Sequence, residues 1–470
     1  MKDIPPKVLK TFERMKESEE GCIELKKIRG RYYVYRATSE WDKEDKKVRK
    51  ITVYLGSITP EGTYVPKKQR VQESKREVFE YANGMLAYHL LDLEEKLKGY
   101  TPHYRELIAA AIIKAIDPKP LRLISSRWEK LYLQKVIDVN LSPKHISSVL
   151  RDTGKGVRWW YDFFEELSDG KLLLYDLTTV FTHSRNIRMA EKGYNNERKY
   201  CNQLGVVIAF SVEDMLPAGI EVYWGSMKDI TTIKDFLERF RKRSMGFILD
   251  RGFWSEKLVK DFRKEGINYV VPLRKNSKLM DTRWLRWRKP FTYRQRTIKW
   301  SRRKTESGQV YLFYDPQLRG EEETALLRKV EQGMMTMEEF EEKKKVAGVI
   351  GLLSNLDRSG EDMFDLYKGR EDVEIAFDAM KNYLDADKTY MHTDEAVRGY
   401  FFVTLLALRI YFGVLRRLRE RELTNRISVE EVFFELSKVQ KIVEPSREYF
   451  ARIPKRARRI MELFPELPMG

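Results

Sequence analysis

The segment YKGREDVEIAFDAMK, residues 367–381, combines residue types and spacings that suit phosphate chemistry. Its chemically active residues follow at steps of three, four and seven, so one continuous helix would align them (Tyr367, Arg370, Glu374 and Lys381). Arginine binds phosphate through two parallel hydrogen bonds, and lysine binds it as a point charge. A second stripe of the same helix is apolar and predicts its buried face (Val373, Ala376, Phe377, Met380 and Leu384).

The simplest alternative for this segment is an i,i+4 ion pair between Arg370 and Glu374. Such a pair stabilises a helix by only about 0.2–0.5 kcal/mol, and it explains neither Tyr367 nor Lys381. We therefore expect Glu374 to complete a set of three carboxylates. Arg370 and Lys381 are expected to receive phosphate oxygens beside it.

Two aspartates complete this set. Asp176 lies inside the apolar run LLLYDL, and Asp250 directly follows GFIL. An acid that interrupts or closes an apolar strand is costly to bury unless it is paired or binds a metal ion. One such residue is often a satisfied structural aspartate, whereas two on neighbouring strands favour a shared cation.

The elements around these acids form an ordered series. Strands are expected at 171–181, 200–213, 216–225, 245–250 and 267–273, with helices at 228–243 and 255–266. The order β-β-β-α-β-α-β predicts an α/β fold with a mixed sheet, antiparallel in its first three strands and parallel afterwards. Strand 346–357 and an apolar helix at 400–415 follow an insertion.

That insertion, residues 278–347, is expected to be rich in strands, basic and aromatic. Between Arg283 and Lys304 there are ten Lys or Arg and no acid. Interleaved aromatic rings suit unpaired or distorted nucleic acid, although they also suit a small structural core. Three of the rings are tryptophans (Trp284, Trp287 and Trp300).

Composition narrows the class of protein. The 470-residue chain has a formal net charge of +18, which favours a polyanionic partner but also fits a merely basic protein.

Two cysteines and five histidines without H-x-x-x-H spacing argue against a zinc site, so a metal ion is expected to be held by carboxylates, as Mg²⁺ or Mn²⁺ is. The sequence lacks a G-x-x-x-x-G-K-[ST] loop, so we expect no nucleotide cofactor. A signal peptide and a membrane span are not expected, which indicates a cytoplasmic protein.

Six regions are expected. They are a basic β-hairpin unit (1–66), a helical region that is a candidate for DNA binding (67–168), two parts of the sheet domain (169–277 and 348–415), the insertion between them (278–347), and a basic helical C-terminal region (416–470). Within the helical region, LSPKHISSVLRDTGKG (141–156) is either half of a helix-turn-helix or, more simply, an ordinary bundle helix.

These motifs together resemble DDE transposases of the insertion-sequence-4-like group, whose catalytic core is RNase H-like. The signature Y-x2-R-x3-E-x6-K of that group is met at Tyr367, Arg370, Glu374 and Lys381. YDLT (175–178) resembles its first-aspartate motif and LDRGFW (249–254) its second. A basic, strand-rich insertion before the final glutamate is also similar, and the resemblance covers most of the chain.

The resemblance implies that Asp176, Asp250 and Glu374 are catalytic and hold two Mg²⁺ ions about 3.5–4 Å apart. Such a site cleaves the ends of an insertion sequence and joins the freed 3′ ends to target DNA, in a cut-and-paste reaction. The family grips the backbone of the transposon end through the residues matching Tyr367, Arg370 and Lys381. A hairpin intermediate requires a base flipped onto an aromatic ring, a role open to any of the three tryptophans above. The resemblance also implies double-stranded DNA as partner, a homodimer on paired ends and a nucleoid-associated location.

Three alternatives remain open at this point. An RNase H-like nuclease without strand joining would keep all three acids. A non-catalytic DNA-binding descendant of a transposase would be favoured by an altered triad. A basic structural protein would use the acids in ion pairs, and breaking a buried pair would then destabilise the protein by about 3–5 kcal/mol.

Overall fold

The computed structural model describes residues 4–18, 21–42, 47–67, 76–193, 201–227, 229–239, 244–282, 287 and 290–467. The chain forms two compact units. The first comprises Met1–Arg76 with Glu444–Ser446, and the second comprises Glu77–Val443 with Arg447–Gly470. Each unit has its own hydrophobic core, and each is described separately below.

The first unit is a four-stranded antiparallel sheet with one helix. The strands follow in chain order and the helix precedes them: α1 (Pro6–Ser18), β1 (Cys22–Ile28), β2 (Arg31–Asp42), β3 (Lys47–Ile58) and β4 (Tyr64–Pro66). The expected hairpin corresponds to β2 and β3, and α1 was not expected. Val8 of α1 packs with Ile23, Val34 and Ile58, which accounts for the helix because the sheet alone would leave these side chains exposed.

The second unit is organised around a large mixed sheet. Five of its strands match the expected series, in the spatial order β9-β8-β6-β10-β11. Their bounds are β6 (Leu172–Phe181), β8 (Asn202–Ser211), β9 (Leu216–Trp224), β10 (Gly246–Leu249) and β11 (Asn268–Pro272). β6, β8 and β9 pair antiparallel, while β10 runs parallel to both β6 and β11. Helices α8 (Asp229–Arg239) and α9 (Glu256–Lys264) make the two crossovers, so the predicted element order and strand directions are confirmed.

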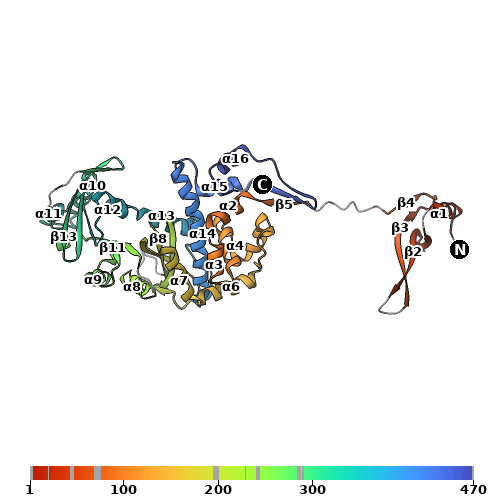
Figure 1. Ribbon diagram of the computed structural model, residues 1–470, viewed down its shortest axis with the longest axis horizontal. Helices are drawn as coiled ribbons and strands as arrows, with labels where there is room; N and C mark the ends of the chain where they lie inside the picture. Colours follow the sequence, from red (N-terminus) through yellow and green to blue (C-terminus); the bar gives the residue numbers. More distant parts are fainter. Residues whose placement is uncertain are drawn as a thin grey trace. The chain divides into compact units, whose positions relative to one another are not determined.

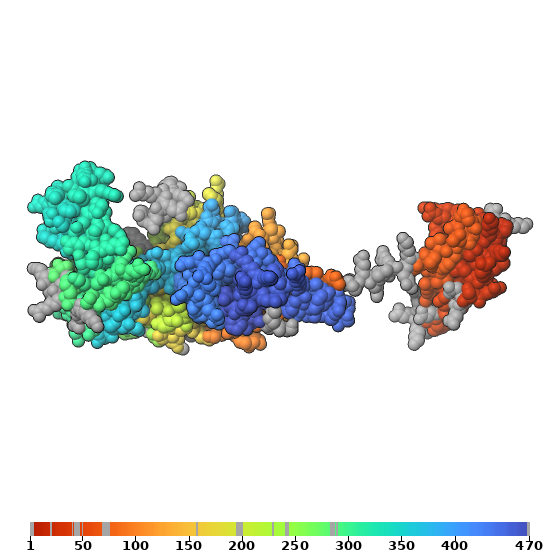
Figure 2. All heavy atoms as spheres, turned by 90° about the horizontal axis from the view of Figure 1, so that it is seen from above, coloured from red at the N-terminus to blue at the C-terminus, as the bar shows by residue number. Residues whose placement is uncertain are grey.

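The insertion continues this same sheet. β15 (Val349–Ser354) pairs antiparallel with β11, and β14 (Gly308–Tyr314), β13 (Arg296–Thr305) and β12 (Phe291–Tyr293) follow outward. Two helices, α10 (Pro316–Glu331) and α11 (Met337–Lys344), lie between β14 and β15 and were not expected. Figure 2 shows residues of this part gathered as a lobe at one end of the second unit.

Helix α14 (Asp394–Glu420) forms the centre of the helical layer (Figure 1). It contains the apolar run predicted as a core helix, and it packs against β9 and against α2 (Ala82–Leu91), α4 (Tyr104–Ile116) and α6 (Pro143–Lys155). Arg409, which interrupts the run, is buried and donates a 2.6 Å hydrogen bond to the carbonyl of Pro217. Burial lowers the pKa of Arg409 to about 10. No helix in the described part of the chain has the length and apolarity to span a membrane.

A helical C-terminal region was expected, but the structure shows that it also contains two strands. It contains α15 (Val429–Leu436), β16 (Gln440–Glu444), β17 (Arg447–Phe450) and α16 (Lys455–Met461). β16 pairs with β5 (Glu77–Glu80), so this hairpin extends a strand from far upstream in the sequence. The remaining short elements are α3 (Glu94–Lys98), α5 (Ile124–Trp128), α7 (Val157–Ser168) and β7 (Glu191–Lys192).

Helices α6 and α14 cross at unusually close range. A Cβ atom added at Gly399 would lie 2.0 Å from the carbonyl oxygen of Leu150, and one at Gly154 would lie 1.8 Å from that of Glu395. Glycine at both positions therefore permits the backbones to touch. The buried face of α6 belongs to this crossing, which fits an ordinary bundle helix and equally the buried side of a helix-turn-helix.

Gly399→Ala should therefore lower the stability of the second unit by about 1–3 kcal/mol, because the two backbones must separate. Gly320→Ala is the control, since nothing lies within 4 Å of the added Cβ there and alanine favours a helix by about 1 kcal/mol over glycine. The thermal unfolding midpoint is expected to fall in the first variant and to stay equal or rise in the second. Equal midpoints in both variants would contradict the proposed role of the crossing.

Candidate active site

The pairing of two parallel strands brings the two predicted aspartates together. Leu249 of β10 is the register partner of Tyr175 in β6, so Asp250 and Asp176 each come one residue later. Neighbouring strands lie about 4.8 Å apart, and residues in register point to the same face. Asp176 is half-buried and accepts a 2.9 Å hydrogen bond from the backbone N–H of Leu177. Asp250 is 40% exposed and precedes a short 3₁₀ turn at Arg251–Phe253.

The segment 367–381 is not the single helix that we expected. α12 (Gly360–Lys368) ends before Gly369, α13 (Glu371–Asp378) follows, and a π-helical turn occupies Ala379–Tyr383. Glycine is a poor helix former, which favours the first break. The second follows from the 2.8 Å hydrogen bond that the N–H of Leu384 donates to the carbonyl of Ala379, five residues back. The predicted apolar stripe is nevertheless buried, with Phe377 only partly so.

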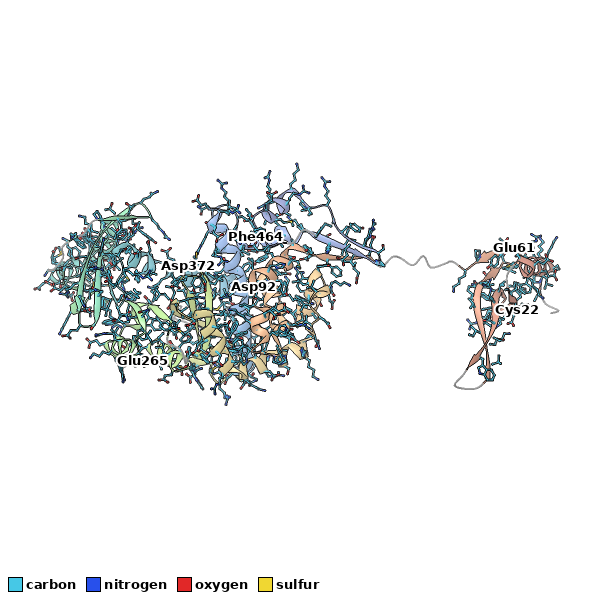
Figure 3. The ribbon with its side chains drawn as sticks, in the orientation of Figure 1. Cys22, Glu61, Asp92, Glu265, Asp372 and Phe464 are labelled. Atoms are coloured by element: carbon cyan, nitrogen blue, oxygen red, sulfur yellow. The ribbon has the colours of Figure 1, made fainter. Side chains whose placement is uncertain are left out.

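Helix α13 is held against the sheet and against α14. It packs on β6 and β8 through Val373 and Ala376, both of which are buried. Asp372, labelled in Figure 3, forms an ion pair with Arg419 near the end of α14, with 2.7 Å between its Oδ1 and Nη1 of the arginine. These contacts place the start of α13, and with it Arg370, beside the aspartates.

Arg370 connects three of the predicted site residues. Its Nη1 lies 2.8 Å from Oδ1 of Asp250, and its Nη2 lies 3.9 Å from Oε1 of Glu374. Its guanidinium carbon is 5.7 Å from the ring centre of Tyr367. The predicted Arg370–Glu374 pair is thus present at the limit of an ion pair, and the closer partner is Asp250. Lys381 is half-buried in the π-helical turn.

The donor set suits a hard divalent cation. All three predicted ligands are carboxylates, which Mg²⁺ and Mn²⁺ prefer. Asp176, Asp250 and Glu374 do not form a group whose oxygens all lie within 4.8 Å of one another. The side chain of Glu374 is 65% exposed, however, so it has the rotamer freedom to approach the two aspartates. The chemistry of the three residues therefore fits the expected metal.

The aromatic residues of the insertion divide into two groups. Phe291 and Tyr293 have ring centres 5.6 and 5.1 Å from that of Phe364 in α12, so they form part of a core. Trp300 also packs on α12, since a Cβ added at Gly360 would lie 2.1 Å from its ring. Trp287 is 39% exposed. Trp284 lies outside the described residues.

The segment that follows the site helix is held by a half-buried lysine. Lys114 of α4 donates 2.8 Å hydrogen bonds to the carbonyl of Leu384 and to the hydroxyl of Tyr400. Three residues after Leu384 the chain pairs with the end of β6, where the N–H of Phe181 donates to the carbonyl of Asp387. Burial lowers the pKa of Lys114 to about 7, against an opposing effect of the Asp385 carboxylate.

One group of potential ligands was missed. His103, Glu106 and His145 have ligand atoms within 4.8 Å of one another, the only such group of three found among the described residues. The two histidines do not show H-x-x-x-H spacing, because His103 precedes α4 whereas His145 lies in α6. The H-x-x-E spacing of His103 and Glu106 is the local sequence signal that indicates two of these three potential ligands.

Comparison with known proteins identifies the family. The model of the transposase DDE domain matches residues 168–410, slightly more than half of the chain, and the chain belongs to this family. The matched range contains all three predicted acids. No curated protein matches. Among solved structures, the chain is similar to the piggyBac transposase synaptic complex with hairpin DNA, with a TM-score of 0.36, 11% identity, and coverage of 76% of this chain and 70% of that one.

The stability of the second unit should depend on pH through Lys114. In the unfolded chain a lysine keeps its proton up to about pH 10.4. Between about pH 7 and 10 the unfolded state therefore binds one proton more, and the free energy of unfolding rises with pH. Relative to Lys114→Met, the wild type should gain about 1.4 kcal/mol per pH unit above pH 7 and nothing below it.

Urea unfolding of both proteins at pH 6, 7, 8 and 9 measures this difference. Lys388→Met removes an exposed lysine from the same segment, and its profile is expected to run parallel to that of the wild type. Parallel profiles for Lys114→Met and the wild type would show that Lys114 does not titrate in this range.

Proposed function

We propose that this protein is a DNA transposase that cleaves DNA at the ends of an insertion sequence and transfers the freed ends to target DNA. The main support is that two carboxylates within the matched DDE domain, Asp176 and Asp250, follow directly after register partners on adjacent parallel strands. The strand order β9-β8-β6-β10-β11 supports an RNase H-like core. The spacing of Tyr367, Arg370 and the residues after them supports the insertion-sequence-4-like group.

In this proposal Asp176, Asp250 and Glu374 hold Mg²⁺ or Mn²⁺. A divalent metal held by these carboxylates would supply activation of the attacking oxygen and stabilisation of the leaving oxygen in an in-line displacement. The three carboxylates repel one another, and Arg370 offsets part of that repulsion through its contact with Asp250.

Arg370 also has the geometry to bind the substrate. Its second nitrogen lies 3.9 Å from Glu374, so one edge of the guanidinium is only loosely engaged. A phosphate oxygen of the transposon end takes this position, with Tyr367 and Lys381 gripping the adjacent backbone. The guanidinium of Arg370 thus stabilises the carboxylate of Asp250 and binds the phosphate at the same time.

The insertion also contacts the site helix through an arginine. Arg294 lies in the turn between β12 and β13, where Arg294 and Gln295 both adopt positive φ angles of 45° and 66°. Non-glycine residues seldom accept this conformation, and here it directs Arg294 onto Glu371 at the start of α13, 2.6 Å away. This ion pair holds the β12–β13 turn against the start of α13, the helix that carries Glu374. We propose a homodimer on paired ends as the working assembly.

Asp250→Asn should abolish cleavage. The loss of one ligand removes several kcal/mol of transition-state stabilisation, which is about a 10³-fold lower rate. Asp357→Asn is a matched control, because Asp357 is also paired with an arginine, at 2.5 Å, but is exposed and lies outside the triad. The assay is cleavage of a supercoiled plasmid that carries the DNA flanking the gene, with Mg²⁺ or with EDTA.

The outcomes separate the competing functions. Mg²⁺-dependent cuts at the gene boundaries, followed by joining of the 3′ ends to a target, are the expected result. Cuts without joining would indicate a nuclease. Salt-sensitive DNA binding without cuts would indicate a non-catalytic descendant, and cleavage by Asp250→Asn at the wild-type rate would exclude the proposed site.

Trp287 and Trp300 should respond differently to replacement by alanine. Trp287 is 39% exposed and its ring contacts only that of Tyr314 among the ring pairs described, so Trp287→Ala should lower stability by no more than about 0.5–1.5 kcal/mol. It should weaken binding of a hairpin-ended DNA by about 1–3 kcal/mol, the value of one base stacked on a ring. Trp300→Ala should instead lower stability by about 2–4 kcal/mol, because its ring packs on α12. Fluorescence anisotropy and thermal unfolding measure the two effects. Unchanged DNA binding by Trp287→Ala would remove this residue from the proposed site.

A further inference from the structure

Three potential metal ligands, none of them among the three acids, converge where the first turns of two helices meet. His103 is the residue that precedes α4, Glu106 lies in the first turn of α4, and His145 lies in the first turn of α6. Nε2 of His145 is 3.1 Å from Oε1 of Glu106. The two imidazole rings are 6.3 Å apart and inclined at 74°.

A hydrogen bond between His145 and Glu106 is the simplest explanation of this arrangement. It accounts for two of the residues but not for the third, since ligand atoms of all three lie within 4.8 Å of one another. We propose that His103, Glu106 and His145 bind one Zn²⁺ ion, or a similar borderline transition-metal ion, and that the ion joins α4 to α6.

The donor set selects the class of metal. Imidazole nitrogen suits Zn²⁺ and its neighbours, whereas Mg²⁺ and Ca²⁺ prefer oxygen alone. In a tetrahedral zinc site with ligand bonds of about 2.0–2.1 Å, donor atoms are about 3.3 Å apart. Glu106 and His145 already satisfy this spacing, and a rotation of His103 closes the set. The side chain of His145 is 34% exposed, so water can complete the fourth position.

The local charge makes the carboxylate essential. The first turns of α4 and α6 both carry the partial positive charge of a helix N-terminus, which disfavours a cation. Neutral histidines do not offset this charge, whereas Glu106 does. Binding is therefore expected to be lost when Glu106 alone is replaced by glutamine, although the amide retains the size of the side chain.

The site is separate from the acids and has a structural role. Lys114, eleven residues after His103, lies about 16 Å further along α4, and it is there that α4 contacts the segment following the site helix. The helices α4 and α6 both pack on α14. A metal ion bound to the two first turns therefore links two supports of the same central helix.

The test is a Zn²⁺ titration of the untagged full-length chain, stripped with EDTA and assayed in excess Mg²⁺. We expect one equivalent of Zn²⁺ by calorimetry, a tetrahedral absorption spectrum with Co²⁺, and a raised thermal unfolding midpoint. The affinity for Zn²⁺ should fall by more than about 100-fold in each of three variants, His103→Gln, Glu106→Gln and His145→Gln. Loss of an outer-sphere partner alone lowers metal affinity by about 10–100-fold, and loss of a ligand should cost more. His392→Gln, an exposed histidine elsewhere, is the control.

Other outcomes overturn the proposal. Absence of a stoichiometric equivalent, or equal affinity in the wild type and the three variants, would exclude the site. Asp250→Asn should bind Zn²⁺ normally, and loss of binding there would assign the ion to the acids instead. Metal-free unfolding midpoints identify any variant that fails to fold, and Glu106→Gln then decides the question because it preserves both histidines.

Discussion

Two carboxylates reach the same point of this protein because β6 and β10 are parallel neighbours in register. Backbone hydrogen bonds set this pairing, and a shift by one residue would turn one aspartate to the opposite face of the sheet. The crossover helix α8 makes the parallel arrangement possible, since parallel strands require a long connection. The apolar residues before each acid, Tyr175 and Leu249, are fully buried and hold the register.

The cost of this arrangement is electrostatic, and Arg370 offsets it. Two carboxylates on adjacent strands repel each other, and a third on α13 adds to the repulsion. Arg370 is only 17% exposed and contacts Asp250 directly, so its charge acts where screening by water is weak. A lysine at this position has a single ammonium group and could contact only one of the two acids. The two terminal nitrogens of arginine instead face Asp250 and Glu374 separately.

Local apolar patterns make some elements of this fold predictable from sequence, whereas elements defined by distant partners are not. Strands such as 171–181 and 245–250 were predictable because each buries a continuous apolar run. Helix α10 was missed because it has no buried residue in the structure, so its sequence lacks an apolar stripe. The β16 strand pairs with β5, more than 350 residues upstream, and no local pattern reports such a partner. The convergence of His103 and His145 depends likewise on how two helices pack.

The break between α12 and α13 determines where Arg370 lies relative to the acids. A single straight helix from 367 to 381 would fix all four signature residues to one axis. Instead, α12 packs on β13 of the insertion, while α13 packs on β6 and β8 and is paired with α14 through Asp372. Arg370 lies at the junction, directly after Gly369. Its position is therefore determined by two separately anchored helices, so it can face Asp250 on one side and Tyr367 on the other.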